Sequence, residues 1–177
     1  PGHRRLKRTD PRPGSRMKVA VFSDVQANIQ AMEVVTDDIQ RWGPDMVIMA
    51  GDLVNRGPSN LECVQLFDRL RSEQGWLPVQ GNHEEWVLKC LRHPPSSPME
   101  AQMRRFTDWA AGQIGNAHVH MLADWADHLC FPGPDESWVH VTHGSMAGNR
   151  VGISARVSDD LLDERLPEDI ALFIGGH

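Results

Sequence analysis

The feature that most constrains the fold is a repeated pattern of a short apolar segment, a loop with polar residues, and a segment of helical character. Lys18 to Phe22 is β-branched and apolar, and it leads through a loop to Ile29 to Arg41, where apolar residues recur at helical spacing. Met46 to Met49 begins a second such unit, and Trp76 to Val79 begins a third. Strands that alternate with helices predict an α/β fold with a largely parallel sheet covered by helices.

The second half of the chain departs from this pattern. Helical spacing predicts two helices, around Glu100 to Gly112 and around Ala117 to Asp127, which we interpret as a small helical insertion around residues 99–127. Leu129 to Phe131 and Trp138 to Thr142 flank a Pro-Gly-Pro-Asp-Glu turn and predict a β-hairpin. The last expected elements are a helix near Asp159 to Leu166 and a strand from Ile170 to Ile174.

Charge is distributed unevenly along the chain. Residues 1–16 carry six Lys and Arg against one Asp, whereas residues 17–177 carry twelve Lys and Arg against twenty-three Asp and Glu. The first sixteen residues have little to bury, so we expect a disordered basic leader there and one folded domain at 17–177. The leader is upstream sequence, a mobile tail or a nucleic-acid arm. The acidic body would repel a nucleic-acid backbone, which argues against nucleic acid as a partner of the domain.

Two further classes of protein are disfavoured by composition. No segment approaches the roughly 18 consecutive apolar residues that a membrane span requires, and no secretory leader is evident. We therefore expect a cytoplasmic protein with no membrane partner. The three cysteines are an odd number without a Cys-x-x-Cys pair, which argues against a disulfide framework or a thiolate zinc site.

Side chains that can bind metals follow five of the expected strands. A single Asp in such a loop caps a helix more often than it binds a metal, but five coincidences at the carboxyl ends of strands favour a site. Carboxylate and amide oxygens mixed with imidazole suit Mn²⁺, Fe or Zn. One carboxylate shared by two ions could hold them roughly 3.5 to 4 Å apart, a spacing that clamps a phosphoryl group and generates hydroxide at neutral pH. The residues, in strand order, are Asp24, Asp52, Asn82 with His83, His143 and His177.

Five motifs across residues 17–177 resemble, in order, those of the calcineurin-like metallophosphoesterases: Ser-Asp-Val-Gln-Ala-Asn, Gly-Asp-Leu-Val-Asn-Arg-Gly-Pro, Gly-Asn-His-Glu, Thr-His-Gly-Ser and Gly-Gly-His. The resemblance implies a β-sandwich flanked by helices, so the parallel sheet is expected to be only half of the arrangement. It also implies two divalent metal ions and hydrolysis of a phosphate mono- or diester by metal-bound hydroxide. The motif forms are similar to those of bacterial Ser/Thr phosphatases, dinucleoside tetraphosphatases and small phosphodiesterases, which leaves the substrate open.

The resemblance implies a role for each ligand. Asp52 is expected to bridge the two metals, with Asp24 serving one site and Asn82, His143 and His177 completing the other. The family usually has His where this chain has Gln26, and it usually continues Gly-His-x-His where this chain stops. Both missing imidazoles belong to the Asp24 site, which keeps two carboxylates and at best the Gln26 amide oxygen. We therefore expect weaker metal binding there, and we expect the second imidazole and the closing strands to lie beyond the final residue.

The resemblance also implies catalytic residues. His83 resembles the general acid that protonates the leaving alkoxide, and Arg56 resembles the arginine that grips the phosphate, where Asn82 would also contact substrate. Asn55 stands where related protein phosphatases have an Asp, and it could hydrogen-bond the His83 ring without stabilising its charged form. Arg150 is a second candidate phosphate contact. The alternatives are a structural loop role for His83 and a helix cap or surface ion pair for Arg56.

A different class of function stays open. Gln26, Asn55 and the incomplete last motif also favour a degenerate protein that holds one metal and binds a phosphoester without significant catalysis. The sequence gives no indication of an oligomeric state.

Overall fold

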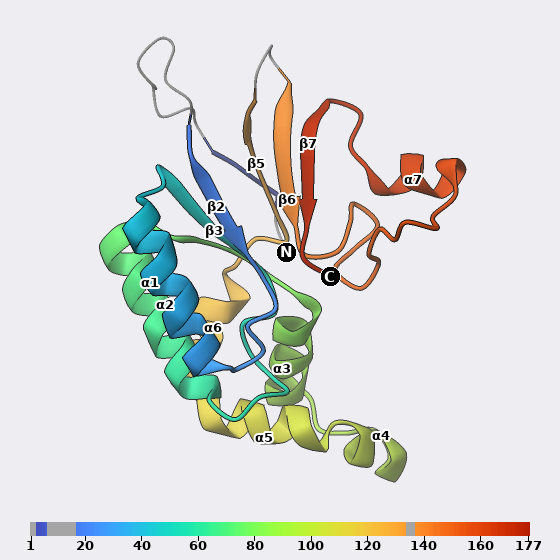
Figure 1. The fold of residues 1–177 in the computed structure, drawn as a ribbon. Helices are drawn as coiled ribbons and strands as arrows, with labels where there is room; N and C mark the ends of the chain where they lie inside the picture. Colours follow the sequence, from blue (N-terminus) through green and yellow to red (C-terminus); the bar gives the residue numbers. More distant parts are fainter. Residues whose placement is uncertain (1–2, 7–16, 134–136) are drawn as a thin grey trace.

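The computed structural model describes residues 3–6, 17–133 and 137–177, and within them two sheets stack face to face (Figure 1). The first sheet is parallel throughout, in the order β2-β3-β4, whereas the second, in the order β1-β5-β6-β7, contains both parallel and antiparallel pairs. The strands are β1 (His3–Arg5), β2 (Val19–Phe22), β3 (Met46–Ala50), β4 (Leu77–Val79), β5 (His128–Pro132), β6 (Trp138–Thr142) and β7 (Ile170–Gly175). The expected β-sandwich is thus confirmed, with a parallel sheet as one of its two layers.

Helices cover the outer face of the first sheet, and α7 lies beside the second sheet (Figure 1). Successive residues of a strand point to opposite faces, so β3 contributes to two cores. Met49 packs in the core between the helices and the first sheet, whereas Ile48 packs between the two sheets, and both are fully buried. The helices are α1 (Ile29–Trp42), α2 (Asn60–Gln74), α3 (Asn82–Arg92), α4 (Pro98–Met103), α5 (Arg105–Ile114), α6 (Asn116–Ala123) and α7 (Asp159–Arg165).

The helical insertion differs in detail from the prediction. The single helix expected at Glu100 to Gly112 is two helices that meet at Arg104, whose guanidinium donates to the carbonyl oxygens of Cys90 and His93. The next helix ends at Ala123 and not near Asp127, because Ala126 forms a parallel β-bridge with Val79 of β4. Helical spacing in the sequence does not reveal either event, since both depend on contacts with distant segments.

The prediction of a disordered leader is wrong for His3–Arg5. These residues form β1, which pairs in parallel with β5, and the strand is continued by a hydrogen bond from Leu6 N–H to the Cys130 carbonyl at 2.9 Å. The Arg5 guanidinium lies 4.6 Å from the centre of the Trp138 ring. A sheet edge can bind a segment through its backbone alone, so a run with few apolar side chains can still form a strand. The rest of the leader lies outside the described residues.

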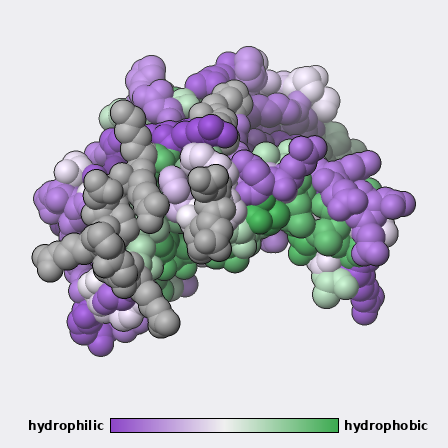
Figure 2. Space-filling model, turned by 90° about the horizontal axis from the view of Figure 1, so that it is seen from above, coloured by the Kyte–Doolittle hydropathy of each residue, from purple (hydrophilic) through white to green (hydrophobic). Residues whose placement is uncertain are grey.

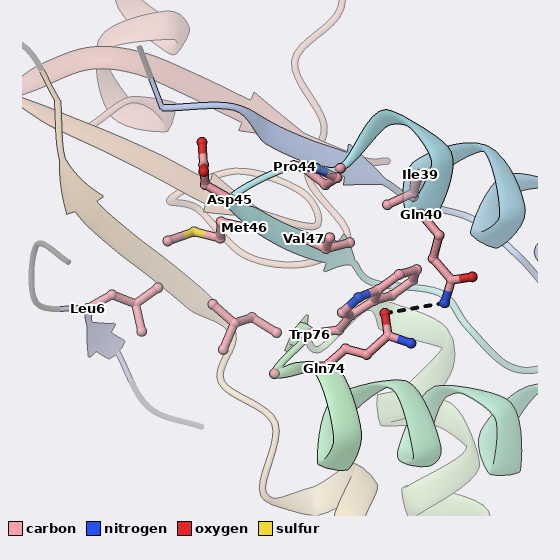
Figure 3. Close-up of a pocket in the computed structure, with 12 residues that line it drawn as sticks. Leu6, Ile39, Gln40, Pro44, Asp45, Met46, Val47, Gln74 and Trp76 are labelled. Atoms are coloured by element: carbon pink, nitrogen blue, oxygen red, sulfur yellow. Dashed lines mark hydrogen bonds between the residues drawn. The ribbon is translucent and has the colours of Figure 1, made fainter. Parts of the chain in front are cut away.

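The surface holds two further features. A pocket of 490 Å³ at the amino-terminal ends of β3 and β4 is lined by Leu6, Met46 and Trp76 among others (Figure 3). Seen from above, the molecule is hollowed on one side, with hydrophobic surface beside the hollow (Figure 2). No described helix is long and apolar enough to cross a membrane.

Candidate functional site

Two loops with unusual backbone conformations follow β2 and β3. Left-handed backbone is uncommon for residues other than Gly, and such residues cluster at functional sites because the surrounding structure must hold them in place. Among the described residues, every non-glycine residue with a positive φ belongs to one of these two loops. They are Asp24 (56°), Gln26 (46°), Ala27 (57°), Asp52 (59°), Asn55 (73°) and Arg56 (63°).

Glu84 fixes the loop that carries Asp52. Its carboxylate is fully buried and accepts hydrogen bonds from the backbone N–H groups of Asp52 at 2.9 Å, Leu53 at 2.8 Å, Val54 at 3.1 Å and Gly81 at 2.8 Å. Burial and the charge of Asp52 raise the pKa of Glu84 to about 7, against the effect of the backbone donors. Sequence reasoning missed this residue, although an acidic residue directly after Asn-His in the third motif was a signal.

Gly81 allows this loop to approach the third motif. A Cβ atom at Gly81 would lie 2.2 Å from Asp52 Oδ1 and 2.5 Å from the Asp52 backbone nitrogen, so no side chain fits there. The backbone N–H of His83 donates to the same Asp52 oxygen at 2.9 Å. Asp52 is therefore held from two sides before any ligand arrives.

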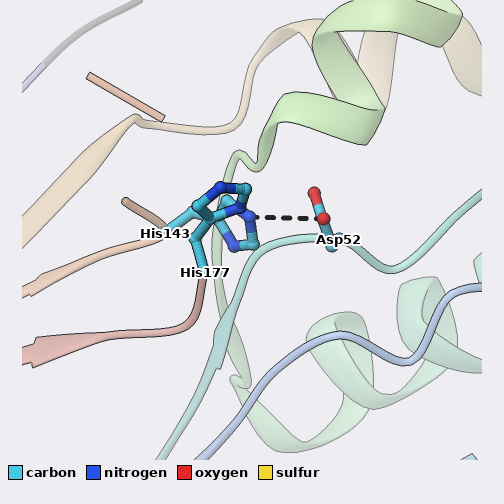
Figure 4. A group of neighbouring side chains, drawn as sticks. All are labelled: Asp52, His143 and His177. Carbon is cyan, nitrogen blue, oxygen red and sulfur yellow. Dashed lines mark ion pairs between the residues drawn. The ribbon is translucent and has the colours of Figure 1, made fainter. Parts of the chain in front are cut away.

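His143 points one ring nitrogen at Asp52. Its Nδ1 donates to the Ala50 carbonyl at 2.9 Å, and its Nε2 lies 3.2 Å from Asp52 Oδ2 and 3.0 Å from Asn82 Oδ1. The contact at Nδ1 fixes the orientation of the ring. His177 approaches the same point from the end of β7, with one nitrogen within 4.8 Å of the ligand atoms of Asp52 and His143 (Figure 4). Loops after β3, β6 and β7 thus bring three ligands together.

This arrangement fits a metal ion. With Nδ1 occupied as a donor, Nε2 of a neutral His143 is an acceptor that faces two further acceptors, the oxygens of Asp52 and Asn82. Burial disfavours the charged imidazolium, but the hydrogen bond and charge of Asp52 outweigh burial, so the pKa of His143 is raised. The cluster therefore attracts positive charge, as a proton or as a metal. Its mixture of carboxylate, amide oxygen and imidazole is a suitable ligand set for a transition metal.

Asp24 and Gln26 lie at the exposed margin of this cluster. The Ser23 hydroxyl donates to the Asp24 carboxylate, and the Gln26 side-chain amide donates to Asp24 Oδ1 at 3.4 Å. Backbone bonds from Asp24 to Gly51 and from Gln26 to the Asp52 carbonyl tie the two loops together. The compact group of carboxylate and histidine ligand atoms among the described residues does not include Asp24.

His83 lies beside Asp52, with Nε2 3.6 Å from Asp52 Oδ2 and accepting a hydrogen bond from Arg56 Nε at 3.2 Å. Burial lowers the pKa of His83, the charge of Asp52 opposes this, and the charge of Arg56 adds to it. The ring packs against Trp86, with 4.6 Å between the ring centres. Nδ1 is buried and has no hydrogen-bond partner within the described part of the chain.

The possible hydrogen bond from Asn55 to the His83 ring is not formed. The Asn55 amide nitrogen donates to Thr107 Oγ1 at 3.1 Å, and its oxygen accepts from the Arg56 backbone N–H at 2.9 Å. Because Thr107 lies on α5, this side chain ties the loop to the helical insertion instead of orienting the histidine.

Arg150 is placed differently from Arg56. It pairs with Glu85 at 3.6 Å and lies 5.5 Å from the centre of the Trp86 ring. Trp86 in turn packs on His83, so Arg150 reaches the cluster only through this tryptophan. Arg56, in contrast, is exposed and contacts His83 directly.

In this β-sandwich, the segments that follow the strands bring carboxylate, amide and imidazole ligands together, which defines a metallophosphoesterase-like site. The sequence profile of the calcineurin-like phosphoesterases matches residues 17–177, and the chain belongs to this family. The family assignment supports phosphoester hydrolysis as the general chemistry of the fold.

Individual proteins are similar to parts of this chain. An uncharacterised protein of Methanocaldococcus jannaschii is 37% identical over 70 residues, which make up 40% of this chain and 27% of that protein. The crystal structure of a metallophosphoesterase from Sphaerobacter thermophilus is similar with a TM-score of 0.55 and 28% identity, covering 75% of this chain and 49% of that one. A hypothetical protein of Pyrococcus horikoshii shares the fold with a TM-score of 0.65 at 13% identity, covering 85% and 64%. The chain thus spans only part of each of these proteins.

Proposed function

We propose that this chain hydrolyses a phosphate mono- or diester with the help of two divalent metal ions, Mn, Fe or Zn. The observation that carries the proposal is the convergence of three acceptor atoms, with His143 Nε2 3.0 Å from Asn82 Oδ1 and 3.2 Å from Asp52 Oδ2. A buried cluster of this kind is costly unless a cation binds in it. The family supports phosphoester hydrolysis as its chemistry.

The ligands divide into two groups that share Asp52. Asn82, His143 and His177 would hold one ion, and Asp24 with the Gln26 amide oxygen would hold the other more weakly. When bound, such ions polarise the phosphoryl oxygens and lower the pKa of water. The role of the protein is to hold the ligands in place. The contact of Glu84 with the Asp52 backbone and the contact of His143 with the Ala50 carbonyl support this role.

Arg56 and His83 would act on the ester itself. A water oxygen attacks phosphorus, the ester P–O bond breaks, and the leaving oxygen takes a proton from His83 Nε2. In the structure this nitrogen accepts from Arg56 Nε. A phosphate that draws the guanidinium onto its own oxygens, with Asn82 as a further contact, would free Nε2 to carry the proton that it later donates.

A specific observation favours a second candidate function. At the site of Asp24, Gln26 stands where the family usually has an imidazole. Within the described residues, no carboxylate binds His83 Nδ1 to orient the ring. A protein with one metal that binds a phosphoester without significant catalysis is therefore the alternative.

The substitution His83→Asn tests the proposal. It should slow hydrolysis of alkyl phosphates by about 10² to 10⁴-fold and affect p-nitrophenyl phosphate much less, because only an alkoxide leaving group needs protonation. Metal content should not change. His118→Asn, in a histidine on α6, serves as the control. An equal loss on both esters would assign His83 to phosphate positioning, a lost metal would make it a ligand, and an unmutated chain inactive on every ester would favour the alternative function.

A further inference from the structure

The helical insertion presents large apolar side chains to solvent beside the site. Met103 of α4 is 73% exposed, and Phe106 and Trp109 of α5 are 77% and 49% exposed. In Figure 1, α5 lies next to the end of α3, and α4 projects from the body. Isolated apolar residues on a surface are ordinary, but a group of them beside a catalytic loop marks a binding surface.

Two pockets adjoin on this face and share Arg56 and Phe106. The first, of 340 Å³, reaches His83 and is also lined by Trp86 and Met103. The second, of 790 Å³, is bounded by Arg105 and Trp109 on α5, among other residues. We call the two together the α5 groove. Both volumes fall within the range of about 300 to 1,000 Å³ that is typical of small-molecule sites.

The α5 groove is positively charged in a protein whose formal net charge is −6. Among the described residues, no carboxylate forms an ion pair with Arg56 or Arg105, whereas the neighbouring Arg104 pairs with Asp108 at 2.9 Å. An exposed guanidinium without a carboxylate partner is free to bind a phosphate through two parallel hydrogen bonds. The groove thus combines two such cations with aromatic surface.

We infer that the α5 groove selects phosphoesters whose alkoxide leaving group carries both a planar base and a second phosphate, as in a nucleoside bisphosphate. This inference rests on the proposed function, since the groove begins at His83 and therefore at the side of the leaving group. The base stacks on Phe106, which lines both pockets, and the second phosphate binds Arg105. The concave shape and the small volume favour a small molecule over a phosphorylated polypeptide.

Four substrates separate the two features of the leaving group. Adenosine 3′,5′-bisphosphate has base and second phosphate, AMP has only the base, fructose 1,6-bisphosphate has only the second phosphate, and glycerol phosphate has neither. All four release an alkoxide, so the demand on His83 is the same. The metal-loaded protein should show the highest kcat/KM for adenosine 3′,5′-bisphosphate.

Two variants then assign the features to residues. Phe106→Ala should lower kcat/KM for the two adenosine substrates by about 5-fold or more relative to the other two, because it removes a stacking surface. Arg105→Gln should lower kcat/KM for the two bisphosphates by about 10-fold relative to the monophosphates, because it removes a charge-assisted contact. Met99→Ala is the matched control, since Met99 is 68% exposed on α4 and lines neither pocket.

The outcomes distinguish this inference from the proposed function. If the esters are hydrolysed but neither variant changes these ratios, the inference is wrong and the proposed function stands. If nothing is hydrolysed, calorimetry with adenosine 3′,5′-bisphosphate decides: binding that both variants weaken supports the groove without catalysis, and no binding overturns it. If a phosphopeptide is hydrolysed faster than all four substrates, and both variants slow this reaction, the inferred nucleotide substrate is wrong and the groove binds a polypeptide.

Discussion

The two groups of candidate metal ligands differ in how firmly the protein holds them. The deep group, Asp52 with Asn82, His143 and His177, is buried except for His177, with exposed fractions of 1%, 2% and 0% for the first three. In the exposed group, Asp24 is exposed and Gln26 is partly exposed, and their side chains are held by the Ser23 hydroxyl and by a long contact of 3.4 Å between the two. Ligands fixed before the metal arrives bind it more tightly, so affinity should follow burial here.

The contrast arises from the position of each loop in the sandwich. The loop after β3 packs against α3, where the Glu84 carboxylate binds its backbone and the His83 backbone N–H binds the Asp52 side chain. His143 comes from β6 of the other sheet and is pinned to the Ala50 carbonyl at the end of β3. The deep group is thus held by contacts from both sheets, whereas the loop of Asp24 is tied to the β3 loop through its backbone and the Asp24 side chain is bound only by its neighbours Ser23 and Gln26.

The largest expected effect comes from the ligand that both groups share. Asp52→Asn removes the carboxylate that would bridge the two ions, and it should weaken metal binding by more than about 100-fold, the upper end of the loss from supporting residues alone. Elemental analysis after loading with Mn²⁺ or Zn²⁺ and dialysis measures this. Asp24→Asn is the matched control and should keep one ion per chain. Retention of metal by Asp52→Asn, or loss of all metal in Asp24→Asn, would show that the division into two groups is wrong.

A smaller effect is expected from the support of the deep group. Glu84→Gln leaves two of the four N–H groups without an acceptor, because each carboxylate oxygen accepts from two of them and the amide nitrogen cannot accept. It should therefore lower the free energy of unfolding by about 3 kcal/mol and metal affinity by about 10- to 100-fold. Urea unfolding and metal titration measure the two losses. Glu85→Gln changes a neighbouring, partly exposed carboxylate and should cost less than about 1 kcal/mol. Equal losses of stability and metal affinity in the two variants would mean that the Asp52 loop keeps its conformation without Glu84.

The deep group was predictable because its members follow strands. The carboxyl ends of strands in a sandwich meet at one edge, so the sequence pattern alone places Asp52, Asn82 and His143 together. The arrangement of the strands in two stacked sheets followed only from the family resemblance, because strands that alternate with helices predict a single parallel sheet.

The supporting contacts were not predictable from the sequence. Glu84 binds backbone groups about thirty residues away, and Asn55 turns to Thr107 on the insertion, 52 residues along the chain. Such contacts depend on tertiary approach and leave no periodicity. β1 was missed for a related reason, since strand pairing through the backbone places no demand on the side chains of His3–Arg5.

The smallest expected effect sharpens the comparison from the exposed side. Gln26→His offers an imidazole nitrogen in place of an amide oxygen, so it should tighten binding of the second ion by about 10-fold while the first is unchanged. His tolerates the left-handed backbone at this position, where φ is 46°, better than most residues.

Calorimetric titration with Mn²⁺ or Zn²⁺ measures this change as the gap between two affinities, which the unmutated chain should already show. Gln40→His places an imidazole on the exposed surface of α1 and controls for adventitious binding. Equal, tight binding of two ions by the unmutated chain would make Gln26 a competent ligand, or would reveal another residue in place of the imidazole. A second affinity that Gln26→His leaves unchanged would mean that Asp24 and Gln26 do not form a metal site. The deep group would then be a metal site and the exposed group an ordinary loop, so the two would differ in kind and not in affinity.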